Sequence, residues 1–166
     1  QLQNITLKLN EFEDAVTGEI TAKVSAGQGK SIRIKPTSWP LPIEEIKKLC
    51  DYGKIPIFGI CLGHQMLALA RGAKTSKLKY GHRGGNHPVK DTETGRVYIT
   101  SQNHGYAVES STLPDFARLS FVNVNDETCE GIDYTDIPAF SVQFHPEACG
   151  GPHDTNFLFD RFVKSL

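Results

Sequence analysis

The sequence lacks the features typical of membrane, secreted or metal-stabilised proteins. It has no run of about 18 apolar residues and no segment with a basic start, an apolar middle and a small-residue cleavage site. None of its four cysteines forms a C-x-x-C pair, so neither a zinc site nor a redox motif is indicated. We therefore expect a protein of a reducing compartment, cytoplasmic or organellar, that neither spans a membrane nor is secreted.

An excess of charge of one sign is also missing. The 18 basic and 19 acidic residues leave a formal net charge of −1, and no block of like charges occurs. This balance predicts no nucleic-acid partner and no membrane-surface partner. A phosphate-binding G-x-x-x-x-G-K-[ST] loop is absent too, so we expect no cofactor on this chain.

The remaining composition is that of a globular enzyme domain. The 166 residues are 39% hydrophobic and 22% charged. A chain of this length buries roughly 70% of the surface that its unfolded form exposes, which is enough for a core without disulfides or metals. Because the chain begins with Gln1 and not with methionine, it is compatible with a processed or excised piece of a longer protein.

One cysteine lies in a setting typical of a nucleophile. The apolar run IPIF at residues 55–58 leads into GICLGHQ at residues 59–65, which predicts that Cys61 lies on a strand-to-helix turn between two glycines. A helix that begins near Leu62 would aim its N-terminal amides at the sulfur and favour the reactive thiolate. The other cysteines have no such setting and are expected to be structural: Cys50, Cys129 and Cys149.

A histidine and a carboxylate in the second half of the chain complete a predicted triad. The letters QFHPE at residues 143–147 follow a strand-like run at residues 139–142. His145 can accept the thiol proton, and Glu147 can orient the ring and stabilise its charged form. The residues therefore predict a triad in which Cys61 is the nucleophile.

These motifs resemble those of the class I glutamine amidotransferases, whose glutaminase domains carry a G-x-C-x-G-x-Q turn and a late H-P-E. Further stretches are similar to the small, glutaminase subunits of carbamoyl-phosphate synthetases: KYGHRGGNHPV at residues 79–89, SQNHGY at residues 101–106 and GPHD at residues 151–154. The resemblance covers residues 55–166. It implies an α/β fold with a mixed central sheet and flanking helices, and an amidotransferase domain over residues 39–166.

The resemblance also implies a reaction, a partner and substrate-binding residues. Thiolate attack on the side-chain carboxamide of glutamine would release ammonia, and water would hydrolyse the γ-glutamyl thioester to glutamate. The ammonia would supply a large subunit or fused synthetase domain, which binds ATP and magnesium and makes carbamoyl phosphate for pyrimidine and arginine synthesis. In the family, the positions that take part in glutamine binding match Leu62, Gln65, Asn103, Gly105 and Tyr106.

The other elements are predicted from periodicity and turn residues. Helices are expected over residues 43–50, after Cys61 and from about residue 155, where Asp154 would cap the last one. His82 and His87 lack a third suitably spaced ligand, so they are interpreted as loop residues that shape a surface and not as a metal site. Strands are expected over residues 96–101, 116–123, 131–134 and 139–144.

The first 38 residues depart from the family pattern and are predicted to be a divergent, β-rich segment of antiparallel strands. Glutaminases of this kind carry an S-N-G-P-G-D-P-like loop whose glycine amide completes the oxyanion hole, but KSIRIKP at residues 30–36 stands in its place. Three explanations stay open: a damaged glutaminase, an unusual loop that still offers an amide, or a fragment completed by another segment or chain. The glycines at residues 27–29 are one candidate for the missing loop.

Two other functions also stay open. The chain could be a catalytically impaired pseudo-glutaminase that binds and regulates a synthetase, because loss of one oxyanion donor costs on the order of 10²- to 10³-fold in rate. It could also be the amidotransferase of another synthetase, such as those that make GMP or anthranilate. The intact triad argues against the first of these, and the motifs GGNHPV at residues 84–89 and GPHD at residues 151–154 argue against the second.

Overall fold

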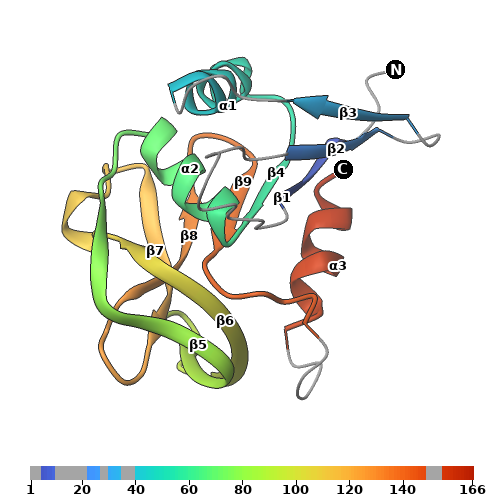
Figure 1. The fold of residues 1–166 in the computed structure, drawn as a ribbon. Coiled ribbons are helices and arrows are strands. Elements are labelled where there is room, and N and C mark those ends of the chain that lie inside the picture. The colour runs from blue at the N-terminus through green and yellow to red at the C-terminus, as the bar shows by residue number, and fades with distance from the viewer. Residues whose placement is uncertain (1–4, 10–21, 27–29, 35–39, 149–154) are drawn as a thin grey trace.

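A computed structural model describes residues 5–9, 22–26, 30–34, 40–148 and 155–166 (Figure 1). The described residues form a mixed α/β fold, as predicted, with two sheets and flanking helices. In chain order the elements are β1 (Ile5–Leu9), β2 (Ala22–Ala26), β3 (Lys30–Ile34), α1 (Pro40–Tyr52), β4 (Ile57–Ile60), α2 (Leu62–Ala70), β5 (Thr75–Asp91), β6 (Val97–Val108), the short 3-10 helix η1 (Ser110–Thr112), β7 (Ala117–Asn123), β8 (Cys129–Tyr134), β9 (Ala139–Val142) and α3 (Phe157–Lys164).

The larger sheet has six strands in the order β4-β9-β8-β7-β5-β6. Strand β4 runs parallel to β9, whereas the remaining neighbours are antiparallel. The predicted strands in the second half of the chain are therefore confirmed as β7, β8 and β9, and the helix predicted over residues 43–50 is confirmed as α1.

No helix in the described part of the chain is long and apolar enough to cross a membrane.

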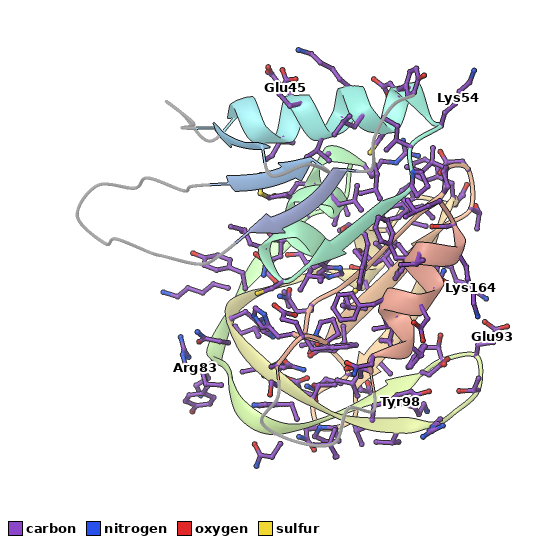
Figure 2. The ribbon with its side chains drawn as sticks, turned by 90° about the vertical axis from the view of Figure 1, so that its right-hand side faces the viewer. Glu45, Lys54, Arg83, Glu93, Tyr98 and Lys164 are labelled. Carbon is purple, nitrogen blue, oxygen red and sulfur yellow. The ribbon has the colours of Figure 1, made fainter. Side chains whose placement is uncertain are left out.

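Two hydrophobic cores lie on opposite faces of this sheet. Consecutive residues of a strand point to opposite faces. Ile57 of β4 accordingly packs in the core that α1 and α2 cover, whereas Phe58 packs with the aromatic residues of α3. Ala139 and Phe140 of β9 repeat this division. Charged side chains such as Lys164 of α3 point outward instead (Figure 2).

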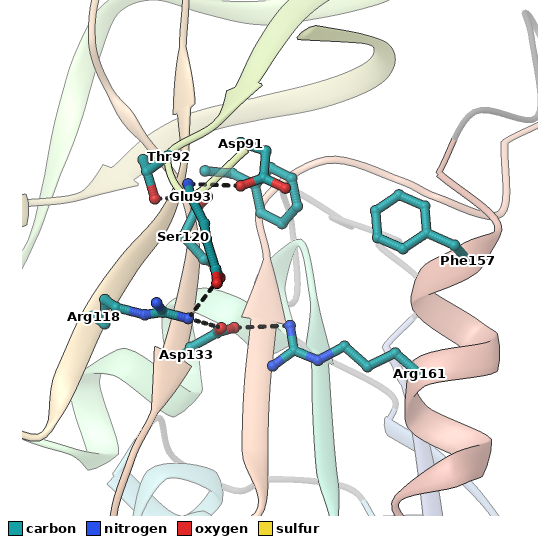
Figure 3. Close-up of a pocket in the computed structure, with 9 residues that line it drawn as sticks. Asp91, Thr92, Glu93, Arg118, Ser120, Asp133, Phe157 and Arg161 are labelled. Carbon is teal, nitrogen blue, oxygen red and sulfur yellow. Dashed lines mark hydrogen bonds and ion pairs between the residues drawn. The ribbon is translucent and has the colours of Figure 1, made fainter. Parts of the chain in front are cut away.

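Ion pairs join α3 to the sheet at the rim of its core (Figure 3). The carboxylate of Asp133 on β8 accepts from Arg118 of β7 and from Arg161 of α3, each at 3.0 Å. The Arg161 guanidinium also lies 4.0 Å from the centroid of the Phe140 ring. Both arginines are roughly half exposed, so solvent screens these pairs and the buried apolar contacts of α3 contribute more to its docking.

The strands β5 and β6 differ from the prediction. Only residues 96–101 were expected to form a strand here, yet β5 and β6 pair along most of their length as long antiparallel strands. The interpretation of His82 and His87 as surface loop residues is therefore wrong, because both lie on β5 and His82 is buried. Residues 83–85 belong to the same strand.

Two glycines explain why the sequence pattern did not predict strand β5. Gly81 and Gly84 have positive φ angles of 70° and 118°, and the pairing with β6 shifts register beside each of them. A β-bulge interrupts the alternation of side chains between the two faces, so no period of two is visible in the sequence. At Gly81 a Cβ atom would come within 2.6 Å of the carbonyl oxygen of His104, which explains why no larger residue fits.

The N-terminal strands form a separate antiparallel sheet in the order β1-β2-β3, as the alternating apolar residues predicted. The division into a divergent segment over residues 1–38 and an amidotransferase domain over residues 39–166 stays a prediction. Three features of the sequence lie outside the described residues: Gly27 and Gly29, Cys149, and the GPHD stretch at residues 151–154. So does Asp154, and α3 begins later than predicted, at Phe157.

Leu158 offers a direct test of how α3 packs on the sheet. Its side chain is fully buried, whereas Val163 on the same helix is 63% exposed. We expect Leu158→Ala to lower the free energy of unfolding by about 2–5 kcal/mol, because it leaves a cavity in the core. The control Val163→Ala should change it by less than about 0.5 kcal/mol. Equal, small losses for both variants in urea denaturation would contradict the packing.

Candidate active site

Cys61 occupies a strained turn between β4 and α2. Its φ of 52° and ψ of −107° lie in a region that residues with a side chain rarely adopt. Its N–H donates to the carbonyl of Val142 at 2.9 Å, and its carbonyl accepts from the N–H of Gln65 at 3.2 Å. A Cβ atom at residue 59 would come within 2.9 Å of the Gly63 carbonyl, so Gly59 is required for this close turn.

Helix α2 begins directly after the cysteine. The first N–H groups of a helix have no acceptor within it, and they carry the positive end of the helix dipole. Here those groups belong to the residues next to Cys61, which is 1% exposed. The predicted binding residue Leu62 is the first residue of this helix and is half-buried. Its amide is one of these N-terminal groups of the helix, and its role in stabilising a negative charge stays a prediction.

His145 and Glu147 follow the end of β9. The Nδ1 atom of His145 lies 3.1 Å from Oε1 of Glu147, and the backbone N–H of His145 donates to the carbonyl of Ser101 at 2.9 Å. A proton on Nδ1 that bonds to the carboxylate leaves Nε2 as the nitrogen that can take a proton. Because β4 and β9 are parallel neighbours, Cys61 and His145 follow adjacent strand ends at one edge of the sheet.

The predicted glutamine-binding residues come from two elements. Gln65 lies one turn into α2, and its Nε2 donates to the carbonyl of Tyr106 on β6 at 2.9 Å. The side chain of Tyr106 is 48% exposed. On the same strand, Asn103 is exposed and Gly105 is half-buried. The structure thus joins Gln65 directly to the β6 segment, and the role of these residues in binding stays a prediction.

Sequence reasoning missed Gln143. This side chain is fully buried, and its Oε1 accepts from Nε2 of Gln65 at 2.9 Å. Its own Nε2 donates to the sulfur of Cys61 at 3.7 Å. A polar residue directly after the fully buried strand β9, two positions before His145, was the signal that could have identified it.

Three other buried titratable side chains are poor candidates for a nucleophile or a general base. Burial lowers the pKa of His64 to about 3, so this ring is neutral and its Nδ1 bonds to the hydroxyl of Ser141 at 2.9 Å. Burial raises the pKa of the Cys129 thiol to about 12 and also raises the pKa of Cys50. Both thiols are therefore protonated at neutral pH, which agrees with a structural role.

A separate polar cluster lies on strands β5, β6 and β8. Candidate ligand atoms of His82, His104 and Glu130 lie within 4.8 Å of one another. Sequence spacing revealed no third ligand for His82, because sheet pairing brings in residues that are distant along the chain. The cleft shown in Figure 3, lined by the ion pairs of α3, contains none of these residues and none of the predicted triad.

The cluster is best described as a buried ion pair. Nδ1 of His82 lies 3.2 Å from a carboxylate oxygen of Glu130, and Nε2 lies 2.8 Å from one of Asp126. The hydrogen bond to Glu130, followed by that to Asp126, raises the pKa of His82 to about 9 despite burial. A ring with both nitrogens protonated cannot ligate a metal, so a metal ion would have to displace a proton there.

This ion pair predicts a pH-dependent stability. The pKa of His82 in the folded chain is about 9, above the value of about 6.5 in an unfolded chain. Its stabilisation is therefore complete below about pH 6.5 and is lost as the pH rises through about 9. We expect the free energy of unfolding to fall over this window by on the order of 2–3 kcal/mol in the wild type, and not in His82→Gln.

Urea denaturation at a series of pH values measures this difference. His87→Gln is the control, because His87 lies on the same strand and its Nε2 bonds to a backbone carbonyl, that of Arg83, and not to a carboxylate. It should keep the wild-type slope. A His82→Gln variant whose stability falls as steeply as that of the wild type would contradict the ion pair.

A family model describes the greater part of the chain. The model named "Glutamine amidotransferase class-I" matches residues 33–165. The chain is also 57% identical over 141 residues to the carbamoyl phosphate synthase small chain of Methanocaldococcus jannaschii, and 56% identical over 143 residues to that of Archaeoglobus fulgidus. These alignments cover 85% and 86% of this chain, but the chain spans only 38% of the length of either relative.

Solved structures share the fold. A glutamine amidotransferase from Thermotoga maritima matches with a TM-score of 0.56 and 26% identity, over 76% of this chain and 52% of that protein. A candidate GMP synthase component from Thermoplasma acidophilum matches with a TM-score of 0.63 and 24% identity, over 74% of this chain and 63% of that protein. The second likeness concerns the fold alone.

Proposed function

This chain belongs to the class I glutamine amidotransferase family, and from that membership we propose that it hydrolyses glutamine to glutamate and ammonia through a thioester on Cys61. The observation that carries the proposal is the strained turn of Cys61 at the end of β4, beside the strand whose end presents His145 and Glu147. Acyl transfer by a cysteine needs a nucleophile, a base and a group that orients the base. The parallel neighbours β4 and β9 lead to residues of these three kinds, which supports the proposal.

In the proposed reaction, His145 first takes the thiol proton at Nε2 while its Nδ1–H donates to Glu147. The sulfur then attacks the side-chain carbonyl carbon of glutamine, and the amide of Leu62 stabilises the resulting oxyanion. The charged His145 ring donates its proton to the departing nitrogen, which leaves as ammonia. Water, deprotonated by the same ring, next attacks the thioester, and the carbon–sulfur bond breaks to release glutamate and the cysteine.

Gln65 has a narrower role in binding than its amide would suggest. Both protons of its Nε2 are used, one by the carbonyl of Tyr106 and one by Oε1 of Gln143. Only its Oε1 is then available to a ligand, so we propose that Gln65 accepts a hydrogen bond from a donor of glutamine. Asn103 and the ring of Tyr106 lie exposed on β6, where they can contact the same substrate.

A second function, a non-catalytic binding module, is favoured by the segment at residues 30–36, which lacks the glycine loop of the family. The amide of Leu62 alone offers one oxyanion donor, and loss of the other costs on the order of 10²- to 10³-fold in rate. A slow but measurable hydrolysis is therefore the outcome that the triad and the altered loop together support.

Substitution of the nucleophile tests hydrolysis. We expect Cys61→Ala to reduce glutamate and ammonia release from glutamine to background, a loss of at least about 10³-fold, because no thioester can form. The matched control Cys50→Ala removes another buried thiol, one on α1, and should retain the wild-type rate. Release that survives in Cys61→Ala, or a folded wild type without release, would favour the non-catalytic module.

We also propose a carbamoyl phosphate synthetase as the assembly that uses the ammonia. The relatives named carbamoyl phosphate synthase small chain support this partner over synthetases that make GMP or anthranilate. ATP and magnesium would bind on a large subunit or fused synthetase domain, and this chain would need no cofactor. The near-neutral net charge of −1 gives no reason to expect nucleic acid instead.

Isotope transfer tests this partner. With ATP, bicarbonate and the large subunit of a carbamoyl phosphate synthase, we expect label from the glutamine side-chain nitrogen to appear in carbamoyl phosphate. Glutamine hydrolysis should rise at the same time. The control is the same mixture with Cys61→Ala, which should make carbamoyl phosphate only from added ammonia. Label that stays in free ammonia, with no rise in hydrolysis, would count against this partner.

A further inference from the structure

We propose that Gln143 is a further catalytic residue, whose side-chain amide stabilises the thiolate of Cys61 and connects it to the binding residue Gln65. The inference rests on the proposed glutaminase function and assigns a role to a residue outside the predicted triad. It implies that the reactivity of the sulfur depends on a donor that comes from the end of β9, in addition to the amides of α2.

Both partners of the contact have almost no exposed surface. Nε2 of Gln143 is 3.7 Å from the sulfur of Cys61, within the longer range of hydrogen bonds to sulfur. The exposed fractions of the two residues are 0% and 1%. The backbone N–H of Gln143 donates to the carbonyl of Glu130 at 2.8 Å, which holds the residue in place. In such buried surroundings, a hydrogen bond to a charged sulfur is stronger than it would be in solvent.

The hydrogen bond from Gln65 selects the orientation of the Gln143 amide. Because Oε1 of Gln143 accepts from Nε2 of Gln65 at 2.9 Å, the opposite end of the amide, its NH₂ group, faces the sulfur. A flipped amide would place its oxygen against the thiolate and its NH₂ group against that of Gln65. Both contacts would be repulsive, so the donor orientation is the stable one.

This donor distinguishes the two protonation states of the cysteine. A thiolate accepts a hydrogen bond far better than a neutral thiol, because hydrogen bonds to ionised acceptors are about twice as strong as neutral ones. Gln143 therefore favours the thiolate before attack. In the thioester the sulfur carries no charge. When water attacks, the carbon–sulfur bond breaks and its electron pair returns to the sulfur, so Gln143 assists the departure as well.

Other titratable groups lie on the elements around the sulfur. His145 and Glu147 follow β9, His64 lies on α2 and His104 lies on β6. Burial holds the pKa of His64 and of His104 below the usual range, so both rings are neutral at neutral pH. The variants described below alter none of these groups, so a shift in the titration of Cys61 in them reports the contact with residue 143.

The test measures the reactivity of Cys61 without any need for glutamine turnover. Iodoacetamide alkylation of Cys61 is followed by mass spectrometry across a range of pH values in wild type, Gln143→Met and Gln143→Glu. Methionine keeps the length of the side chain but removes the donor. We expect its alkylation midpoint to rise by about one pH unit, with an approximately tenfold lower rate below that midpoint. The carboxylate introduced by Gln143→Glu should raise the midpoint further through repulsion.

A buried amide elsewhere provides the matched control. Asn123 is 1% exposed and its side chain donates to Glu130 and not to Cys61. Asn123→Ala should therefore lose stability but keep the wild-type alkylation midpoint. Unchanged midpoints in both Gln143 variants, or an equal shift in Asn123→Ala, would overturn the inference. Near-isosteric Gln143→Glu keeps the test decisive if Gln143→Met does not fold.

Failure of this inference is distinguishable from failure of the proposed function. If the wild type releases no ammonia but its alkylation midpoint depends on Gln143, the stabilisation of the thiolate by Gln143 holds, and its catalytic role fails together with the glutaminase proposal. If the wild type hydrolyses glutamine and the midpoint is insensitive to Gln143, the glutaminase proposal holds and the inference fails.

Discussion

The parallel pairing of β4 with β9 is the constraint on which the rest of the site depends. Ile60 pairs with Val142 at the ends of these strands, and the N–H of Cys61 extends the ladder by one more bond to Val142. Cys61, the predicted nucleophile, and the segment that leads to His145 therefore leave the sheet together. A different register would separate them, because each residue of slippage moves a strand end by about 3.3 Å and reverses its side chains.

The cost of the turn at Cys61 is offset by packing on both sides of these two strands. A strained backbone persists only where the surrounding structure determines it, and here one core lies under α1 and α2 and the other under α3. The alternation of Ile57 with Phe58, and of Ala139 with Phe140, places one residue of each pair in each core. Apolar burial on both faces thus stabilises the carboxyl ends of β4 and β9, where the polar residues of the candidate site lie.

Buried polar groups form two networks that meet at one residue. The side chain of Glu130 pairs with His82, and its backbone carbonyl accepts the N–H of Gln143. Gln143 in turn contacts Gln65 and Cys61. Strand β8, which carries Glu130, therefore holds Gln143 in place beside Cys61, although it supplies no residue of the predicted triad. Such networks specify a unique arrangement because each member left unsatisfied in a low dielectric would be costly.

The sequence by itself determined the local features: the glycine-flanked Cys61, the H-P-E stretch with His145, the helices and most strands, and with them a family resemblance that is confirmed. Each of these features depends on residues close together in the sequence, because turn signals and hydrophobic periodicity act over a few positions. Only the tertiary structure decided that β5 and His82 are part of the sheet and that Gln143 reaches the sulfur. Bulges erase strand periodicity, and contacts between distant strands depend on register, which no local pattern contains.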